Sequence, residues 1–452
     1  MVDLIVKGGF VITADKNRRI IYKGAVAIED GKIIAVDKSE KILKEYKAEI
    51  VIGGDDKIVM PGLICAHCHT HGRVAIGMPV ELPVEFYDIL SKWWWPMIED
   101  QLTKDDVYIL SRASCTEMVK RGITCIGDVM EAPNALPGAL ESEAKAFLEV
   151  GVRGVLAFEA TERISKENGE LGIQENLNFV KKWNKPGSLV KGLFCVHTVF
   201  SCSPEMLMKV RDLANKHKAG IHLHVEESVY EVNYCKKTYG KLPIEHLRDI
   251  GFLGPDVLAA QCVQTSDQEI KILKEYDVKV AHNPQSNMEC GVGIAPVVKM
   301  LNEGITVSLG TDGLFPDMFE TMRTTYLVHK GYLRDPTVLP AETVIEMATI
   351  NGAKSLGIEN ETGSIEPGKR ADLIVFSIPS PGPITADNLC SLVMYLGSGE
   401  YIDTVIVDGK IIVEKGRVKT VNEEEVRKKA FETYIDMLRR NKLEIKEESI
   451  KI

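Results

Sequence analysis

The sequence predicts an α/β protein in which a (β/α)8 barrel of the TIM type is joined to a small β-sandwich built from both chain ends. Through the middle of the chain, short apolar runs alternate with helical patterns, which is typical of parallel strands connected by helices. Eight such runs can be counted, the number of strands in a (β/α)8 barrel. Nearly the same hairpin sequence occurs near both ends of the chain.

The composition is that of an ordinary soluble globular protein. Its 452 residues, 45% hydrophobic and 27% charged, are enough for about two to four domains. A net charge of −10 without any Lys/Arg-rich block argues against a nucleic-acid binder. No apolar run reaches the ~18 residues that a membrane span needs, and the N-terminus lacks the pattern of a secretory signal. We therefore expect a cytoplasmic protein whose ten cysteines are reduced.

The predicted sandwich comprises residues 1–58 and 366–420. One hairpin pairs residues 25–28 with 32–36 across Asp30-Gly31, and its near twin pairs residues 403–407 with 410–413 across Asp408-Gly409. Asp-Gly between apolar segments indicates a tight hairpin turn, because glycine adopts positive φ freely. A lone hairpin cannot bury an apolar face. We therefore favour one shared sandwich over two unrelated hairpins.

The predicted barrel comprises residues 59–365, and reactive groups in such barrels lie at the C-terminal ends of the strands. Its strands are expected at residues 59–64, 123–127, 152–158, 190–196, 220–223, 257–260, 278–281 and 305–310. The residues at the ends of these runs are His67 and His69, Asp128, Glu159, His197, His224, Gln261, His282 with Asn283, and Asp312. A mere scaffold needs only turn residues there, so this pattern indicates an active site.

Two other segments have recognisable patterns. The loop after the first predicted strand contains Trp93-Trp94-Trp95, which either packs a helix against the barrel or covers a pocket and stacks on a flat ring. Near the C-terminus, an amphipathic helix begins after the expected N-cap Asn422, with Glu425 three residues later. We assign residues 421–452 to this helix and a tail, with a docking role and no chemistry.

Four of the strand-end residues form a set of metal ligands. Because side chains alternate along a strand, His67 and His69 point to the same side, and His224 and Asp312 follow the fifth and eighth strands. Three imidazoles and a carboxylate suit one divalent ion, with zinc favoured over iron, and leave a position for water, whose pKa the ion lowers. His222 shares a face with His224 and is an alternative ligand. We prefer His224 because it lies at the strand end.

Glu227 is the candidate for proton transfer. It lies three residues after His224, where the chain leaves the strand, and a carboxyl group there could carry protons from water to a ring nitrogen and a leaving group. The neighbouring Glu226 completes an H-x-E pattern with His224, as in the zinc nucleobase deaminases. The Pro-Cys-x-x-Cys that those enzymes also need is absent, so we exclude their fold.

Four further residues are candidates for contacts with substrate: His197, Glu85, Arg153 and His282. The alternative for these residues is ordinary turn polarity or charge on a helix surface.

Seven phrases carry a family resemblance, and together they span nearly the whole chain. They are PGLICAHCH (61–69), RGIT (121–124), CSPE (202–205), IHLHVEE (221–227), AHNPQSN (281–287), LGTDG (309–313) and GSIEPGKRADL (363–373). With them the chain resembles the amidohydrolase superfamily, in the branch of 5′-methylthioadenosine/S-adenosylhomocysteine deaminases, guanine deaminases and chlorohydrolase-like aminohydrolases.

This resemblance implies a role for each matching residue. The metal ligands would be His67, His69, His224 and Asp312, with Glu227 as proton shuttle and Asp312 also accepting the proton of the attacking water. A single metal ion is implied, because the fourth strand ends in a histidine, at 197, where two-metal relatives carry a bridging lysine.

Two positions depart from the family pattern. Where these deaminases read Ala-His-Cys-Val-His, this chain reads Ala-Gln-Cys-Val-Gln, with Gln261 in place of the histidine that is implied to hydrogen-bond the attacking hydroxide. Glutamine still donates a hydrogen bond but carries no proton, a loss typically worth roughly 10²–10⁴ in rate. Either Glu227 and Asp312 bear the chemistry alone, or the reaction is not the usual deamination. Before Gln174 the arginine of many adenosine-type deaminases is missing, which weakens an assignment to methylthioadenosine or S-adenosylhomocysteine.

The expected function is that of a metal-dependent aminohydrolase. It would replace an exocyclic amine of a nitrogen heterocycle, such as a purine or adenosine derivative, a pterin or a triazine, by oxygen and release ammonia. Two alternatives stay open: the same site with another leaving group, as in a chlorohydrolase or a cyclic amidohydrolase, and a catalytically silent metal-binding barrel. The expected partners are a small heterocyclic substrate and one divalent ion, with no nucleic acid, no membrane and assembly as a homo-oligomer.

Overall fold

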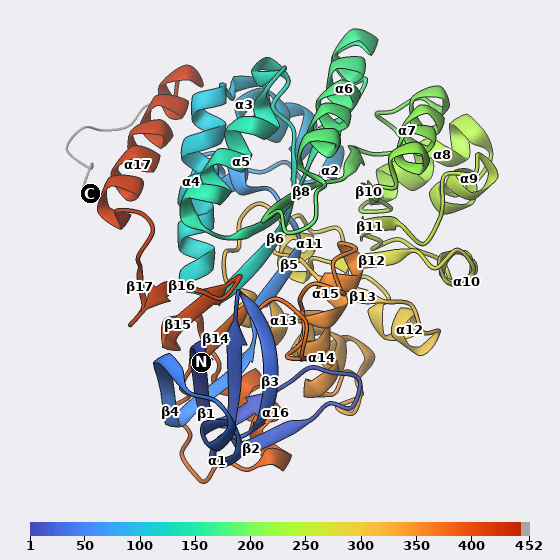
Figure 1. Ribbon diagram of the computed structural model, residues 1–452. Helices are drawn as coiled ribbons and strands as arrows, with labels where there is room; N and C mark the ends of the chain where they lie inside the picture. Colours follow the sequence, from blue (N-terminus) through green and yellow to red (C-terminus); the bar gives the residue numbers. More distant parts are fainter. Residues whose placement is uncertain (444–452) are drawn as a thin grey trace.

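The computed structural model describes residues 1–443 and contains two sheets (Figure 1). A parallel sheet, surrounded by helices, forms an almost closed barrel, and a mixed sheet built from both chain ends lies beneath it in this view. Residues 444–452, which we assigned to the C-terminal tail, lie outside the described residues.

The barrel has the predicted number of strand positions. Its strands are β5 (Leu63–Cys68), β6 (Ile123–Met130), β7 (Arg153–Ala160), β8 (Val190–Gly192), β9 (Phe194–Val196), β10 (Ile221–Val225), β11 (Val257–Gln261), β12 (Lys279–His282) and β13 (Val307–Leu309). β8 and β9 are two parts of the predicted fourth strand, and both pair with β7. A bridge between Cys68 and Asp312 brings the end of the last strand beside the first. The (β/α)8 prediction is confirmed.

The first predicted barrel strand begins later than expected. Its first three residues end β4 (Ala48–Pro61) of the mixed sheet, and β5 begins only after Pro61-Gly62. Proline cannot donate to a sheet ladder, so the chain leaves one sheet here and enters the other. A side chain at Gly62 would lie 2.0 Å from Thr124 Oγ1, so this passage between the sheets requires glycine.

The mixed sheet joins the two ends of the chain. Besides β4 it contains β1 (Val2–Ile12), β2 (Ile20–Glu29), β3 (Lys32–Lys38), β14 (Leu373–Phe376), β15 (Ile402–Val407), β16 (Lys410–Glu414) and β17 (Arg417–Val418). β4 pairs with β1 on one side and with β14 on the other. Apolar side chains of both halves, among them Leu4, Val26, Leu373 and Ile406, share one core. The prediction that both ends build one unit is confirmed.

The twin hairpin turns contact each other. Asp30 and Gly31 have φ of 50° and 73°, and Asp408 and Gly409 have φ of 51° and 77°. A side chain at Gly409 would lie 2.5 Å from the Cα of Gly31. Positive φ and this close approach together explain why the Asp-Gly sequence occurs twice.

Helices cover the outside of the barrel (Figure 1). Around the barrel they are α4 (Lys104–Lys120), α5 (Ala139–Val150), α6 (Lys166–Trp183), α7 (Pro204–His217), α8 (Val229–Tyr239), α9 (Pro243–Asp249), α10 (Asp267–Glu275), α11 (Pro284–Glu289), α12 (Val297–Asn302), α13 (Met318–Leu333), α14 (Ala341–Met347) and α15 (Ile350–Ser355). The others are α1 (Ser39–Glu45), α2 (Phe86–Ile89), α3 (Trp95–Met97), α16 (Ala386–Leu396) and α17 (Glu423–Arg440).

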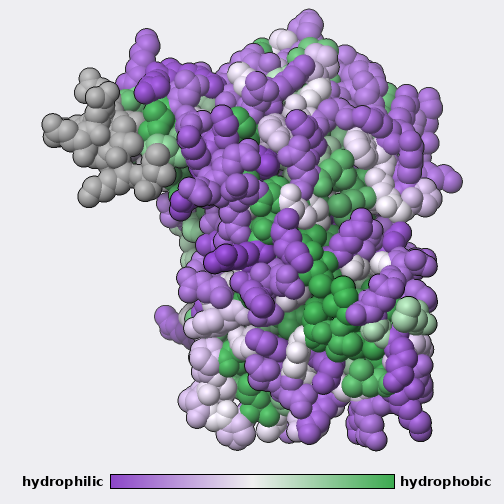
Figure 2. All heavy atoms as spheres, turned by 60° about the vertical axis from the view of Figure 1, so that its left-hand side comes forward, coloured by the Kyte–Doolittle hydropathy of each residue, from purple (hydrophilic) through white to green (hydrophobic). Residues whose placement is uncertain are grey.

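The C-terminal helix α17 docks on α4. Asn422 caps it as predicted, accepting hydrogen bonds from the backbone of Glu424 and Glu425, and Arg440 donates to Asp106 of α4 over 2.7 Å. Figure 2 shows a face that is mostly hydrophilic, with a band of exposed hydrophobic residues between the polar ones. None of the helices in residues 1–443 combines the length and hydropathy required to cross a membrane.

Candidate active site and metal centre

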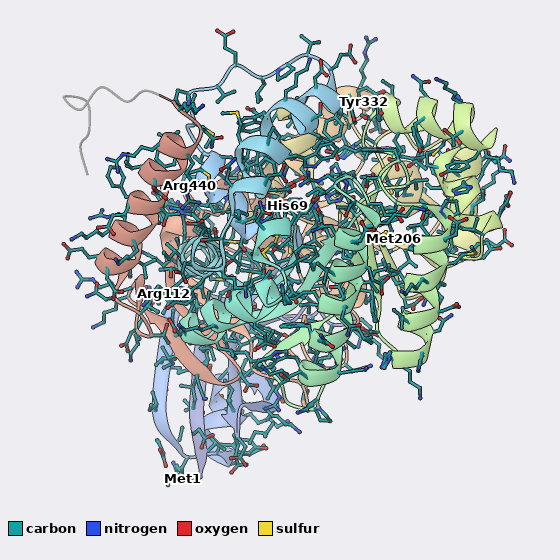
Figure 3. The ribbon with its side chains drawn as sticks, turned by 90° about the horizontal axis from the view of Figure 1, so that it is seen from above. Met1, His69, Arg112, Met206, Tyr332 and Arg440 are labelled. Carbon is teal, nitrogen blue, oxygen red and sulfur yellow. The ribbon has the colours of Figure 1, made fainter. Side chains whose placement is uncertain are left out.

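The four predicted metal ligands come together at the C-terminal mouth of the barrel, and His69 lies near the centre of the molecule when it is seen from above (Figure 3). One ring nitrogen each of His67, His69 and His224 lies within 4.8 Å of the others. His69 Nε2 is 3.3 Å from His224 Nε2 and 3.4 Å from Asp312 Oδ1, and His67 Nε2 is 3.9 Å from Asp312 Oδ2. Strands β5, β10 and β13 are far apart in sequence, and the barrel brings their ends together.

Partners outside the cluster orient the three imidazoles. His69 Nδ1 donates to the carbonyl oxygen of Val129 over 2.7 Å, and His67 Nδ1 lies 3.1 Å from His222 Nε2. His224 Nδ1 faces Glu159 Oε1 at 3.3 Å. Each Nε2 therefore points to the common centre, and His222, our alternative ligand, lies behind His67.

The donor set fits a divalent metal ion. His67 Nε2 is buried and has no hydrogen-bond partner among residues 1–443, a costly state for a polar atom that a metal ion relieves. Burial lowers the pKa of His69 to about 4, although the negative charge of Asp312 acts in the opposite direction and raises it. Burial and the neighbouring His69 lower the pKa of His224 to about 3. The imidazoles are therefore neutral, the form that binds a metal ion.

Asp312 stays ionised in these surroundings. Burial alone would raise the pKa of its carboxyl group, but His69, His224 and the amide of Gln261 together hold that pKa below its ordinary value. The backbone of Asp312 has a φ of 57° and that of Gln261 a φ of 80°, values that residues other than glycine rarely adopt. Such strain is commonly kept where a side chain must be aimed at one point.

The side chain of Gln261 forms a hydrogen bond with Asp312. Its Nε2 donates to Asp312 Oδ2 over 2.8 Å, and its Oε1 accepts hydrogen bonds from Asn283 Nδ2 at 3.0 Å and Asn287 Nδ2 at 2.6 Å. The family resemblance implies a hydrogen bond from this position to the attacking hydroxide, and the structure adds a direct hydrogen bond to Asp312, a predicted metal ligand.

Glu227 lines the cavity above the cluster. Burial, and then the charges of Asp312 and Glu231, raise the pKa of its carboxyl group well above the ordinary value, which favours its protonated form. Glu226 is buried beside Glu269 outside the cavity lining.

The cavity is open to solvent, and its empty space measures about 610 Å³ when the solvent at the mouth is included. Its wall includes the apolar side chains of Phe86, Ile89, Leu90, Trp93 and Leu314. Of the three adjacent tryptophans, 93 and 95 are buried, while 93 and 94 also line the cavity. The tryptophan segment therefore does both things that were expected as alternatives: it packs against the barrel, and it forms part of the cavity wall.

The candidates for substrate contacts lie in different places. His197 lines the cavity, with its Nδ1 2.9 Å from Ser201 Oγ. Glu85 is exposed just before α2. His282 is buried with its Nε2 3.2 Å from His329 Nε2, outside the lining.

Arg153 requires a correction. As the first residue of β7 it lies at the N-terminal end of the barrel, away from the mouth, and its guanidinium pairs with Asp372 at 2.7 and 3.1 Å. Both side chains are buried. Arg153 therefore joins the barrel to the mixed sheet and does not reach the cavity.

Sequence reasoning missed a buried acidic network beside the metal ligands. Carboxylate oxygens of Glu99, Glu131 and Glu159 lie within 4.8 Å of one another. Arg163 donates to Glu131 Oε1 over 2.5 Å, and Trp94 Nε1 donates to Glu99 Oε1 over 2.6 Å. Glu159 is the strand-end residue already named from the sequence, and Glu131 comes just after the end of β6 and could have been found by the same signal. Glu99 comes from an irregular segment that has none.

Comparison with known proteins identifies the family. The sequence profile of the amidohydrolase family matches residues 58–412. The chain belongs to the amidohydrolase family. Among its relatives, a 5′-deoxyadenosine deaminase of Methanosarcina acetivorans is 39% identical over 431 residues, covering 94% of this chain and 96% of the relative. A 5-methylthioadenosine/S-adenosylhomocysteine deaminase of Syntrophomonas wolfei is 36% identical over 430 residues, with the same two coverages.

Solved structures share the fold of this amidohydrolase. An adenosine deaminase from Xanthomonas campestris with bound zinc has a TM-score of 0.89 at 23% identity, over 97% of this chain and 99% of the other. An atrazine chlorohydrolase from Arthrobacter aurescens, complexed with zinc, has a TM-score of 0.84 at 22% identity, over 95% and 100%. The family resemblance stated from the sequence is confirmed.

Proposed function

We propose that this amidohydrolase is a hydrolytic deaminase of adenosine-type nucleosides, which replaces the exocyclic amine of the purine ring by oxygen and releases ammonia. The observation that carries the proposal is the placement of Glu227 and Asp312 at one cavity, beside three converging imidazoles. The relatives named above are deaminases of adenosine derivatives, which supports the purine over the pterins and triazines that the sequence left open.

The proposed cofactor is one divalent metal ion, zinc in preference to iron. His67, His69, His224 and Asp312 would hold it. Zinc in the two structural neighbours supports this choice. When bound, such an ion acts as a Lewis acid that makes water a better nucleophile at neutral pH.

The protein side chains would move the protons. The reaction adds one water: its oxygen bonds to the ring carbon, and the carbon–nitrogen bond to the amine breaks. Asp312, ionised despite burial, would accept a proton from the attacking water. Glu227, whose raised pKa favours the protonated form, would donate its proton to the adjacent ring nitrogen. As the carbon–nitrogen bond breaks, the proton on Asp312 would pass to the departing amine, and the proton of the new hydroxyl group would return to Glu227 as the oxygen becomes a carbonyl. The two protons of the water thus end on the ring nitrogen and on ammonia.

The remaining wall would position the substrate. Trp94 and Phe86 offer aromatic faces for a flat ring, and His197 offers a ring nitrogen at the wall. Gln261, held by two asparagines, would keep Asp312 in place. The apolar side chains of the wall would exclude water that competes for these hydrogen bonds.

The test is an assay of ammonia release by the metal-loaded enzyme, with elemental analysis of the same preparation. The panel contains adenosine, 5′-deoxyadenosine, 5′-methylthioadenosine, guanine, a pterin and a chlorotriazine. We expect about one metal ion per chain and turnover of the 6-aminopurine nucleosides. Chloride release from the triazine without any ammonia release would overturn the proposal in favour of a chlorohydrolase, and metal-loaded protein that turns over no member would support the silent barrel. A cytoplasmic location and a homo-oligomeric state remain predictions, to be tested by cell fractionation and light scattering.

A further inference from the structure

The barrel closes loosely where its first and last strands meet. Other neighbouring strands pair along much of their length, as β10 does with β11, whereas β5 and β13 are joined by an isolated bridge between Cys68 and Asp312. The backbone N–H groups of Thr311 and Asp312 add hydrogen bonds to the carbonyl oxygen of His67, over 3.0 and 3.1 Å. This seam of the barrel therefore lies directly beside the predicted metal ligands.

A second, smaller cavity lies at this seam. The residues that follow β5 and β13 bound it together with α4, which packs on the outside of the barrel, and its wall includes Thr70 and Ser114. Its empty space measures about 250 Å³ when the solvent at its opening is included. Because a water molecule takes roughly 30 Å³, this space suits a few small molecules such as water or ammonia.

The two cavities share part of their walls. His69, Asp312 and Gly313 line both the active-site cavity and the second cavity. The ring of Trp94 packs closely at this place, since a Cβ atom at Gly313 would lie 2.8 Å from its Cη2 atom and one at Gly72 would lie 2.9 Å from it. Two of the predicted metal ligands, His69 and Asp312, therefore stand between the two cavities.

On its outer side the second cavity adjoins a groove on the protein surface. Arg73, Ile76, Leu314 and Pro316 line both the second cavity and the groove, which α4 and α17 border. The groove measures about 2340 Å³ with the open solvent included. A continuous series of shared wall residues therefore leads from the metal ligands to solvent without passing through the mouth of the active site.

The proposed reaction needs such a connection for its small molecules. Ammonia would form beside Asp312, at the inner end of the active-site cavity, while the nucleoside product lies between it and the mouth. A new water molecule must also reach the metal ligands before the next turnover. Hydroxyl groups of Thr70 and Ser114 in the wall of the second cavity can exchange hydrogen bonds with ammonia or water.

From this arrangement we propose that the second cavity is a side passage, through which ammonia leaves and water enters while a nucleoside occupies the mouth. The inference rests on the proposed deaminase function and adds a separate path for its small product. The side passage carries only ammonia and water, so its role is the same for every nucleoside that the enzyme deaminates. Blocking it should slow the steps that follow the chemical reaction, because product release limits the rate of many enzymes.

The experiment fills the side passage and measures the chemical step separately from product release. Ile76→Trp enlarges a side chain at the outer end of the side passage, and Ser114→Leu enlarges one at its inner wall. With the metal-loaded enzyme and 5′-deoxyadenosine, we expect a single-turnover rate within about twofold of the parent and a steady-state rate at least about fivefold lower. A burst of about one deaminated nucleoside per active site should precede the slow phase.

The matched control is Ile50→Trp. Ile50 is 49% exposed and Ile76 is 45% exposed, but Ile50 belongs to β4 of the mixed sheet, so its variant should behave as the parent. Steady-state rates within about twofold of the parent in both folded variants of the side passage would overturn the inference and leave the deaminase function intact. An equal fall of the single-turnover and steady-state rates would also overturn it, because the side chains would then act on the chemical step. Absence of deamination by the metal-loaded parent would instead count against the proposed function.

Discussion

The amide nitrogen of Gln261 lies 2.8 Å from Asp312 Oδ2, and this contact fixes the acid of the candidate metal centre. On its other side the amide oxygen of Gln261 accepts from Asn283 and Asn287. The reversed amide would place its oxygen against a carboxylate and its NH2 against two further donors, so only one orientation satisfies all the groups. A histidine at 261 could accept from just one of the two asparagines.

Gln261→Ala is expected to lower the rate of ammonia release by about 10- to 100-fold while the metal content stays unchanged. The reason is that Asp312 would lose a donor that holds it, while the three imidazoles and the acid remain. Turnover and elemental analysis of the same sample measure the two effects. Gln264→Ala is the control, because that side chain donates to the carbonyl oxygen of Val292 and should leave turnover unchanged. Loss of metal from Gln261→Ala would show that this residue acts on the ion.

Glu227→Gln is expected to reduce turnover by about 10²- to 10⁴-fold, with metal bound as in the parent protein. An amide has the same shape as the acid but cannot pass a proton to the ring. The neighbouring Glu226→Gln is the matched control, since this buried carboxyl group lies outside the cavity lining and its loss should leave turnover near that of the parent. Activity of Glu227→Gln within tenfold of the parent would mean that another group carries the proton.

The candidate site could be predicted because it depends on regular features of the chain. Parallel strands place their carboxyl ends at one edge, so the positions of His67, His69, His224 and Asp312 after four apolar runs are enough to predict their convergence. The period of two along a strand assigns the first pair to one face. The structure then shows that His222 is not one of the four converging side chains, because its ring nitrogen contacts His67. The sequence pattern does not predict this contact.

Other features depend on partners that the sequence does not reveal. Arg153 is the second residue of the predicted strand 152–158, and its pairing with Asp372 spans 219 residues. Glu99 belongs to a three-residue helix without periodicity, and its place in the acidic network follows from the path of the loop after β5. Pro61-Gly62 indicated a break in the apolar run. Because the residues on both sides are apolar, the sequence did not show that those before the break belong to the mixed sheet and those after it to the barrel. Long-range pairing and irregular loops therefore set the limit of the prediction.

Arg153→Ala is expected to lower the free energy of unfolding by about 3–5 kcal/mol, because it leaves Asp372 buried without its partner. The folded fraction should keep the turnover of the parent, since this pair lies at the end of the barrel opposite the mouth. Urea unfolding and ammonia release measure the two quantities. Arg18→Ala, which removes an exposed partner of Glu346, is the control and should cost no more than about 1 kcal/mol. A loss of turnover at full folding would show that Arg153 influences the site.

Glu99 is expected to make the stability of the metal-free protein depend on pH. Burial raises the pKa of this carboxyl group from 4.5 to about 8, with Arg163 and Trp94 opposing the rise in part. The folded state therefore binds a proton that the unfolded state has released between these values, so the stability contribution is complete below about pH 4.5 and is lost as pH rises through about 8. Urea unfolding with chelator present should show a decrease in the free energy of unfolding from pH 5 to pH 8, of which Glu99→Gln removes at least about 1 kcal/mol. Glu85→Gln, at an exposed position, should keep the decrease of the parent. An equal decrease in Glu99→Gln and the parent would mean that the other carboxyl groups of the network bind the proton.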